Sequence, residues 1–189
     1  MGHSLQITGV QGSGKSTISS YLDEELEDYD VLDYADLILE ESEVNLKDKI
    51  PELERQERIR IYERVNERLS EMTEGKKLIV ENHLTLRNGN EFLYTTSEEL
   101  EMYKTKGIIN ISPPPSLVKE RREESEERDR PTETIDEIAE QQELNKDQLE
   151  KCHSELNLPY WDFKNIDFEK TVKEISDIIS DEKWKKYHL

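Results

Sequence analysis

The sequence predicts an α/β fold, a five-stranded parallel sheet with helices on both faces. Short apolar segments alternate with longer segments whose apolar residues recur at helical spacing, which is typical of parallel sheets crossed by helices. Residues 78–80 are an uninterrupted apolar run and indicate a strand that is buried on both sides. Residues 9–17 fit the pattern G-x-x-x-x-G-K-[ST] and stand between an expected strand and an expected helix, as that pattern requires.

The first half of the chain is expected to contain three strands and three helices. The strands are expected at residues 5–8, 30–33 and 77–82. The helices are expected at about 18–26, 35–39 and 51–72, where apolar residues recur at helical spacing. Pro51 suits the first turn of the third helix, because its missing N–H is not needed there. The arginines and glutamates of that helix are expected to form its solvated face.

After the third strand, residues 83–96 are expected to form an extended loop. The reason is the turn chemistry of residues 88–90, which read Asn-Gly-Asn. Ser97 is expected to cap a short helix that runs through Tyr103, because a serine hydroxyl can accept a hydrogen bond from the first turn.

The rest of the chain continues the alternation. Strands are expected at 108–112, where three prolines follow, and at 160–163. Helices are expected from about 116, from about 134 to 156, and over 168–179. Thr134 and Glu137 form the capping-box pattern of the second of these helices. No repeat or linker interrupts the pattern, so residues 1–189 are expected to form a single domain.

The composition is strongly acidic. The 189 residues carry a formal net charge of -19. Such a surface is expected to repel nucleic acid, and a cleft that binds a nucleotide must therefore be locally basic. An acidic surface also keeps a protein soluble at high salt, so adaptation to a saline habitat is one explanation of the charge.

The sequence lacks the marks of a membrane or secreted protein. No run of about 18 apolar residues predicts a membrane span, and no basic and apolar leader precedes the first strand. The single cysteine, Cys152, cannot form an internal disulfide and suits a reducing compartment. A cytoplasmic location is therefore expected.

Residues 9–17 predict a phosphate-binding P-loop. Glycines let the backbone turn so that successive N–H groups point inward and form an anion-binding nest. Lys15 can reach the β- and γ-phosphates, the Ser16 hydroxyl can ligate Mg²⁺, and the following helix adds the positive end of its dipole. The residues expected to hold nucleotide phosphates are Gly9, Gln11, Gly12, Ser13, Gly14, Lys15, Ser16 and Thr17.

Polar residues follow the other expected strands, at the edge where open α/β sheets bind ligands. Glu81 ends the third strand, where a carboxylate can hold Mg²⁺ directly or through water; its alternative role is to cap neighbouring backbone. Asp33 ends the second strand and leaves the same two possibilities open. His83 is expected to shape the pocket, and Asn165 follows the fifth strand.

Four arginines belong to an expected hairpin, which consists of a helix, a charged corner and a second helix. Arg121 and Arg122 precede the corner, and Arg128 and Arg130 lie in it. One interpretation is a solvated hairpin of mixed charge, because glutamates surround the arginines. The favoured interpretation is a corner that closes over a transferring phosphoryl group and neutralises its charge.

These patterns together resemble the archaeal type of adenylate kinase. Residues 78–89, LIVENHLTLRNG, are similar to the family's third strand running into D-T-H-x-T-x-K, which lines the AMP site. Arg121-Arg122, followed by Arg128-x-Arg130, is similar to the arginines that flank the family's lid. Residues 142–146, QELNK, are similar to Q-x-x-N-R on the helix after that lid.

The resemblance implies a P-loop NTPase fold of the nucleotide kinase type, with an acceptor region at about 34–97 and a short lid at about 121–146. It implies transfer of the γ-phosphoryl group of MgATP to AMP, which gives two ADP, with Mg²⁺ as cofactor and nucleotides as the partners. The archaeal family includes trimers, so a monomer and a homo-oligomer both stay open.

The resemblance also implies a role for each site residue. Lys15, Arg128 and Arg130 act on the phosphoryl group, together with Lys146. Ser16 ligates the metal and Glu81 supports it through water. Arg121 or Arg122 stacks on the adenine of ATP, and Asn165 approaches its edge. The residues expected at the AMP site are Asp33, His83, Thr85, Arg87 and Lys146.

The chain departs from the family's pattern mainly where the acceptor is read. Glu81 replaces an aspartate, Arg87 replaces a lysine, and Lys146 replaces an arginine, which loses bidentate geometry. One alternative is therefore a P-loop kinase for another small acceptor, such as CMP or a polyol acid. A second is a binding module that hydrolyses ATP slowly and signals to a partner. Acceptor-dependent ADP formation separates the kinases from the switch.

Overall fold

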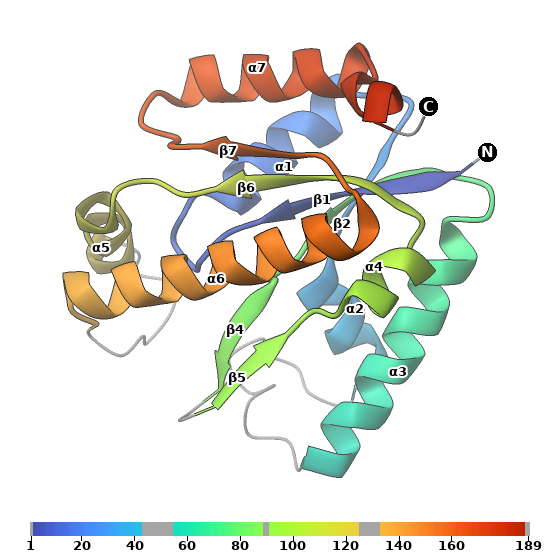
Figure 1. Cartoon of the computed structure of the whole chain (residues 1–189), viewed down its shortest axis with the longest axis horizontal. Coiled ribbons are helices and arrows are strands. Elements are labelled where there is room, and N and C mark those ends of the chain that lie inside the picture. Colours follow the sequence, from blue (N-terminus) through green and yellow to red (C-terminus); the bar gives the residue numbers. More distant parts are fainter. Residues whose placement is uncertain (1, 43–54, 89–90, 125–132, 188–189) are drawn as a thin grey trace.

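A computed structural model describes residues 2–42, 55–88, 91–124 and 133–187. Its centre is one sheet of five parallel strands in the order β2-β3-β1-β6-β7 (Figure 1). The strands are β1 (His3–Thr8), β2 (Asp30–Asp33), β3 (Lys77–Glu81), β6 (Thr105–Ile111) and β7 (Tyr160–Phe163). The sequence-based prediction of a five-stranded parallel sheet is confirmed. Only the start of β6 differs notably, since it lies three residues before the expected one.

Helices cover both faces of this sheet (Figure 1). One face carries α1 (Lys15–Glu25), α7 (Phe168–Ser180) and the short 3₁₀ helix η2 (Lys183–Tyr187). The other face carries α2 (Tyr34–Glu41), α3 (Arg55–Met72), α4 (Ser97–Met102) and α6 (Ile135–Leu156). Helix α5 (Pro115–Glu124) joins β6 to the segment that precedes α6. None of the described helices is long and apolar enough to cross a membrane.

The strands divide their side chains between two cores. In β3, Leu78 and Val80 belong to the cluster under α2, α3 and α6, whereas Ile79 belongs to the cluster under α1 and α7. This follows from the period of two in a strand, which sends successive side chains to opposite faces. The apolar run at residues 78–80 is therefore explained by burial on both sides.

The expectation of an extended loop over residues 83–96 is wrong. Strands β4 (Thr85–Asn88) and β5 (Glu91–Tyr94) form a separate antiparallel hairpin, in which Leu86 lies opposite Leu93. The sequence carried a signal for it, because two short runs rich in apolar residues are separated by two residues, Gly-Asn, which favour a hairpin turn. The turn residues themselves, 89–90, lie outside the described residues.

The expected cap of α4 is displaced by one residue. Thr96, not Ser97, accepts the hydrogen bond from the backbone N–H of Glu99, and the Glu99 side chain accepts one from the N–H of Thr96. The reason is the T-x-x-E spacing, which allows both bonds of a capping box. Ser97 instead donates a hydrogen bond to Glu155 on α6. The capping box expected at Thr134 is confirmed, and Pro51 lies outside the described residues.

Candidate active site

The P-loop connects the carboxyl end of β1 to α1. Gly14, which precedes the helix, has a φ of 94°, and a Cβ built on it would lie 2.5 Å from Asn165 Nδ2. Only glycine fits this position without strain. Since Gly14 has no side chain that could cap α1, the N–H groups of the first turn are available to donate hydrogen bonds to a bound anion. The buried Lys15 ammonium donates to the carbonyl oxygens of Gly9, at 2.9 Å, and Val10, at 3.2 Å.

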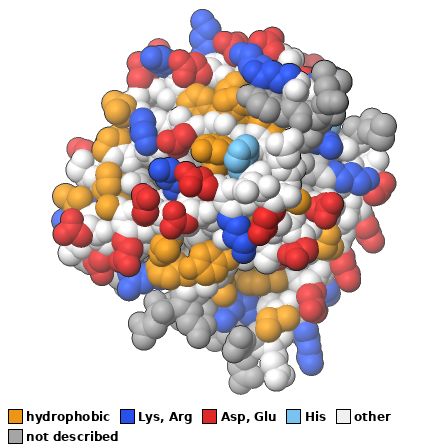
Figure 2. Space-filling view, in the orientation of Figure 1, with side chains coloured by type: hydrophobic (Ala, Val, Ile, Leu, Met, Phe, Trp, Pro, Cys, Tyr) orange, Lys and Arg blue, Asp and Glu red, His pale blue; other side chains and the backbone are white. Residues whose placement is uncertain are grey.

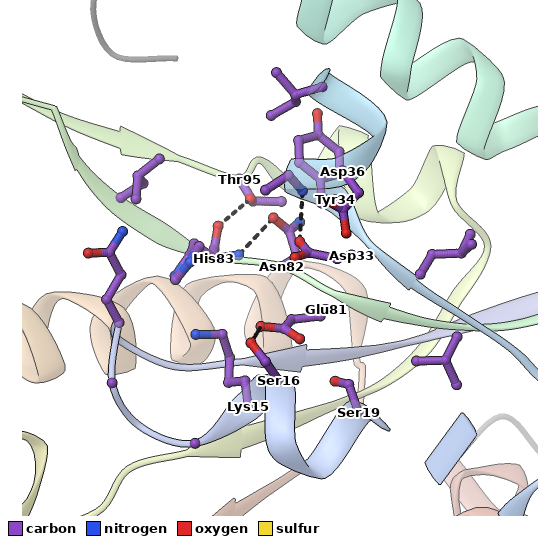
Figure 3. A pocket seen from close by; sticks show the side chains of 18 of the residues that line it. Lys15, Ser16, Ser19, Asp33, Tyr34, Asp36, Glu81, Asn82, His83 and Thr95 are labelled. Carbon is purple, nitrogen blue, oxygen red and sulfur yellow. Dashed lines mark hydrogen bonds between the residues drawn. The ribbon is translucent and has the colours of Figure 1, made fainter. Parts of the chain in front are cut away.

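A hydroxyl and a carboxylate meet beside this loop. The Ser16 hydroxyl donates to Glu81 Oε1 at 2.8 Å, and Figure 3 shows both side chains next to Lys15. Asp33 lies beside Glu81 because β2 and β3 pair in that register. Hydroxyl and carboxylate oxygens are ligands that Mg²⁺ accepts, usually with waters in its remaining positions. The pair therefore fits Mg²⁺, although no group of three or more His, Cys, Asp or Glu in the described part of the chain could hold a metal by itself.

The residues after β2 and β3 shape the wall next to the P-loop. Asp33 Oδ1 accepts a hydrogen bond from the N–H of Ala35 at 2.8 Å, so Asp33 caps α2 and also lines the cleft. His83 Nδ1 lies 3.0 Å from the carbonyl oxygen of Gly9. Because a carbonyl oxygen only accepts, that contact requires a proton on Nδ1. His83 thus ties the segment after β3 to the P-loop.

The two neighbouring arginines of α5 have different surroundings. Arg121 donates to the carbonyl oxygens of Ser13 and Asn165, both at 2.8 Å, and lines the cleft. Burial lowers the pKa of its guanidinium. Arg122 points elsewhere and donates to the Gln11 carbonyl at 2.9 Å and to the carboxylate of Glu133. Of the two, Arg121 is therefore the one that faces the cleft.

Asn165 completes this end of the cleft. Its side chain is buried, and its Nδ2 donates to the Ser13 carbonyl oxygen at 2.9 Å. Its Oδ1 is buried without a hydrogen-bond partner. An unpaired buried oxygen costs free energy, which a donor on a bound ligand would recover.

The P-loop opens into a cleft of about 1020 Å³ that extends toward α2, α3 and the hairpin. Among the residues expected in the site, the cleft is lined by Gln11, Gly12, Gly14, Lys15, Ser16, Thr17, Asp33, Glu81, His83, Arg87, Arg121 and Asn165. Thr85 is buried and, like Lys146, is not among the residues that line it. Lys146 lies on α6 with its side chain 56% exposed, near Glu150. Arg128 and Arg130 lie outside the described residues.

The far end of the cleft contains residues that the sequence-based prediction missed. These residues are Tyr34, Arg58, Tyr62, Glu99 and Tyr103. Arg58 was expected on a solvated face, and that is wrong, because only 9% of it is exposed. It lies one helical turn before Ile61 and Tyr62, on the stripe of α3 that packs against the rest of the protein. This helical spacing from Ile61 and Tyr62 could have indicated, from the sequence alone, that the Arg58 side chain is buried.

Asn66 organises the floor of this end. Its Oδ1 accepts hydrogen bonds from the hydroxyls of Tyr34, at 2.5 Å, and Tyr103. Its Nδ2 donates to Glu99 Oε1 at 2.9 Å. Burial raises the pKa of both tyrosines, so their hydroxyls stay protonated and donate. The result is an aromatic pocket with one carboxylate and one arginine, which suits a planar polar ligand.

The charges differ between the surface and the cleft. Figure 2 shows Asp and Glu side chains spread over the visible face, with Lys and Arg between them. In the cleft, four basic side chains come from four different elements, namely Lys15, Arg58, Arg87 and Arg121. Five acidic side chains line the same cleft, namely Asp23, Asp33, Asp36, Glu81 and Glu99. The cleft is therefore less acidic than the whole chain, with its 26 basic and 45 acidic side chains, but it is not the basic cleft that was expected.

Known proteins resemble the chain in sequence and in fold. A family model described as an AAA domain matches residues 8–139. The adenylate kinase of Methanopyrus kandleri is 31% identical over 153 residues, which are 77% of this chain and 80% of that protein. The adenylate kinase of Thermococcus kodakarensis is 29% identical over 147 residues, which are 74% of each protein.

Solved structures share the fold at lower identity. Shikimate kinase from Aquifex aeolicus superposes with a TM-score of 0.62 at 19% identity, over 94% of this chain and 96% of that one. Shikimate kinase from Acinetobacter baumannii in complex with shikimate gives a TM-score of 0.61 at 17% identity, over 96% and 94%. At such identities the likeness concerns the fold alone.

Proposed function

Since this chain belongs to the archaeal adenylate kinase family and is a nucleoside monophosphate kinase, we propose that it transfers the γ-phosphoryl group of ATP to AMP and releases two ADP. The observation that carries the proposal is the continuous cleft. A phosphate loop with a buried lysine lies at one end, and an aromatic pocket with Arg58, Arg87 and Glu99 lies at the other. Two nucleotides with facing phosphates fit such an arrangement.

ATP binds at the P-loop in this proposal. The loop amides and Lys15 hold its phosphates, while Arg121 and Asn165 approach its base. The Ser16 hydroxyl and the Glu81 carboxylate, whose Oγ and Oε1 atoms are 2.8 Å apart, would hold Mg²⁺. The metal would neutralise charge on the phosphate oxygens.

AMP binds at the far end. Arg58 and Arg87 contact its phosphate, because a guanidinium can bind a phosphate with two parallel hydrogen bonds. The rings of Tyr34 and Tyr62, which lie 6.4 Å apart at 51°, border the space for its base. His83 and Asp33 stand between the two ends. The predicted roles of Thr85 and Lys146 in binding AMP stay predictions.

The reaction needs positioning and charge stabilisation more than a strong base. Lys15 and the loop amides stabilise charge on the transferring group from one side. Arg128 and Arg130, by resemblance to the family, stabilise it from the other. Exclusion of water by the closed site would favour transfer to AMP over hydrolysis.

The test is ADP formation from MgATP with AMP, CMP, UMP, GMP or shikimate offered singly, and with no acceptor as control. Fast turnover with AMP alone is expected. Preference for CMP or another nucleotide would replace the acceptor and keep the enzyme class. Slow hydrolysis that no acceptor accelerates would support the ATPase switch instead. Lys15→Ala, tested in parallel, should remove acceptor-dependent turnover and so exclude a contaminating kinase.

A further inference from the structure

One carboxylate, that of Glu133, contacts two arginines, Arg87 in the cleft wall and Arg122 against the P-loop. Its Oε1 lies 3.1 Å from Arg87 Nη1, and its Oε2 accepts a hydrogen bond from Arg122 Nη1. Gln141 on α6 donates to the same Oε1 at 2.5 Å. Glu133 therefore joins the hairpin of β4 and β5, helix α5 and helix α6 at one point.

Arg122 belongs to the ATP end. Its side chain is only 8% exposed, and its Nε donates to the Gln11 carbonyl at the tip of the P-loop. A Cβ at Gly12 would lie 2.9 Å from Arg122 Cγ, so the stem of this arginine packs against the loop. Val10, Val118 and Ile138 form a small buried cluster beside it. The position of Arg122 is thus coupled to the shape of the P-loop.

Arg87 belongs to the AMP end. Arg87 lies on β4 and lines the cleft. Strand β4 also contacts α6. Any shift of the hairpin relative to α6 would change the distance between Arg87 and Glu133.

We propose that Glu133 is a positioning residue that couples the two nucleotide sites, by fixing Arg122 at the P-loop and Arg87 at the acceptor hairpin in one relative arrangement. The inference rests on the proposed function in that it places the second nucleotide at the hairpin. Binding of either nucleotide changes the placement of its own arginine. Because both arginines share one carboxylate, that change alters the arrangement offered to the other nucleotide.

The chemistry of the side chain supports this role. A carboxylate has two acceptor oxygens, and here each of them accepts from a different guanidinium. A glutamine has one acceptor oxygen and would turn its NH₂ group toward the other arginine. Glu133→Gln therefore holds one arginine at a time. The side chains of Arg122 and Glu133 are 8% and 15% exposed, so solvent and salt screen their contact less than a surface pair. The Arg87 side chain is 42% exposed, so its contact with Glu133 is screened more.

Glu137 provides a matched control. Its Oε1 lies 3.9 Å from the same Arg87 Nη1, but no contact joins it to Arg122. Its other oxygen accepts the hydrogen bonds that cap α6 at Thr134, a role that glutamine also performs. Glu137→Gln thus removes the same charge from the same helix end without breaking the link.

The first measurement is the dissociation constant of the β,γ-imido analogue of ATP, with and without AMP, by calorimetry. In wild-type protein and Glu137→Gln we expect AMP to strengthen analogue binding at least about fivefold, a usual size for coupling between sites. In Glu133→Gln we expect less than about a twofold effect, on the same scale. Equal coupling in all three proteins, or equal loss in both variants, would overturn the proposal.

Thermal unfolding decides whether Glu133→Gln is folded. If it is not, Glu133→Asp replaces it, because the shorter side chain keeps the charge but reaches only one arginine. The same loss of coupling is then expected, and retained coupling would overturn the proposal.

A second measurement separates this proposal from the identity of the acceptor. The analogue alone should change amide hydrogen exchange in β4 and β5 of wild-type protein and Glu137→Gln, and not in Glu133→Gln. This measurement uses no AMP, so its result does not depend on which nucleotide the acceptor assay identifies as the acceptor. Hairpin exchange that the analogue leaves unchanged in wild-type protein, or changes equally in Glu133→Gln, would overturn the coupling role, whatever the acceptor.

Discussion

Replacement of Asn66 by alanine tests the polar floor of the acceptor pocket. The substitution removes the oxygen that accepts from Tyr34 and Tyr103 and the NH₂ group that donates to Glu99. Tyr103 is only 1% exposed, so water cannot easily replace the lost partner. Tyr34 lines the cleft and is half-buried, so its hydroxyl is more easily hydrated.

The expected cost follows from these exposures. A buried donor left without a partner costs about 1–3 kcal/mol, and we take the full value for Tyr103 and the lower end for Tyr34. The total is about 2–4 kcal/mol of unfolding free energy. For a chain of 189 residues this corresponds to a Tm lower by roughly 5–15 °C.

The assay is denaturant unfolding of four proteins: wild type, Asn66→Ala, Tyr103→Phe and the double variant. Tyr103→Phe alone should cost about 1 kcal/mol, because it removes a hydroxyl together with its hydrogen bond. In the double variant the Tyr103 hydroxyl is absent, so removing Asn66 costs less there than in wild type. We expect the two changes to fall short of additivity by about 1–2 kcal/mol.

Additive effects, within about 0.5 kcal/mol, would refute the reasoning. They would mean that Tyr103 finds water or another acceptor when Asn66 is absent. The same four proteins should also differ in acceptor KM more than in the KM for ATP, because these side chains lie at the acceptor end of the cleft.

Three further predictions concern catalysis and the cysteine. Lys15→Ala should lower turnover by orders of magnitude with little change in Tm; a variant with near wild-type turnover would remove Lys15 from the mechanism. Arg128→Ala or Arg130→Ala should lower kcat more than it weakens ATP binding, and wild-type turnover in the double variant would exclude both from catalysis. Burial raises the pKa of the Cys152 thiol, so a maleimide at pH 7 should label it only after denaturation. Because the unfolded thiol ionises first, Cys152 should contribute a loss of stability as pH rises past about 8.5, and Cys152→Ser should lessen that slope.

The P-loop and the sheet could be predicted because their signals are local. Gly14, Lys15 and Ser16 are adjacent in sequence, and their spacing alone sets the strand, loop and helix order. The position of Glu81 was also predictable, because it is the last residue of an apolar strand whose end must reach the edge of the sheet. The hairpin of β4 and β5 had a local signal as well, namely the two short apolar runs and the Gly-Asn pair between them.

The acceptor pocket depended on packing over long sequence distances. Arg58 enters the cleft because of how α3 is rotated about its axis against α2 and β3, and the arginines of that helix are not distinguished by charge. Asn66 meets Tyr34 and Tyr103 across 32 and 37 residues of sequence. Helical spacing could have placed Arg58 on the buried side of α3, but no periodicity records which polar residues of other elements will meet there.

The sequence by itself determined the phosphate loop, the parallel sheet and the family, because these depend on residue spacing within one strand, loop or helix. Only the tertiary structure decided between neighbours such as Arg121, which lines the cleft, and Arg122, which holds the P-loop and Glu133. Both residues are arginines and have the same chemistry. Because adjacent residues on a helix point about 100° apart, their surroundings differ. Those surroundings come from elements that are distant in the chain, and packing alone brings them together.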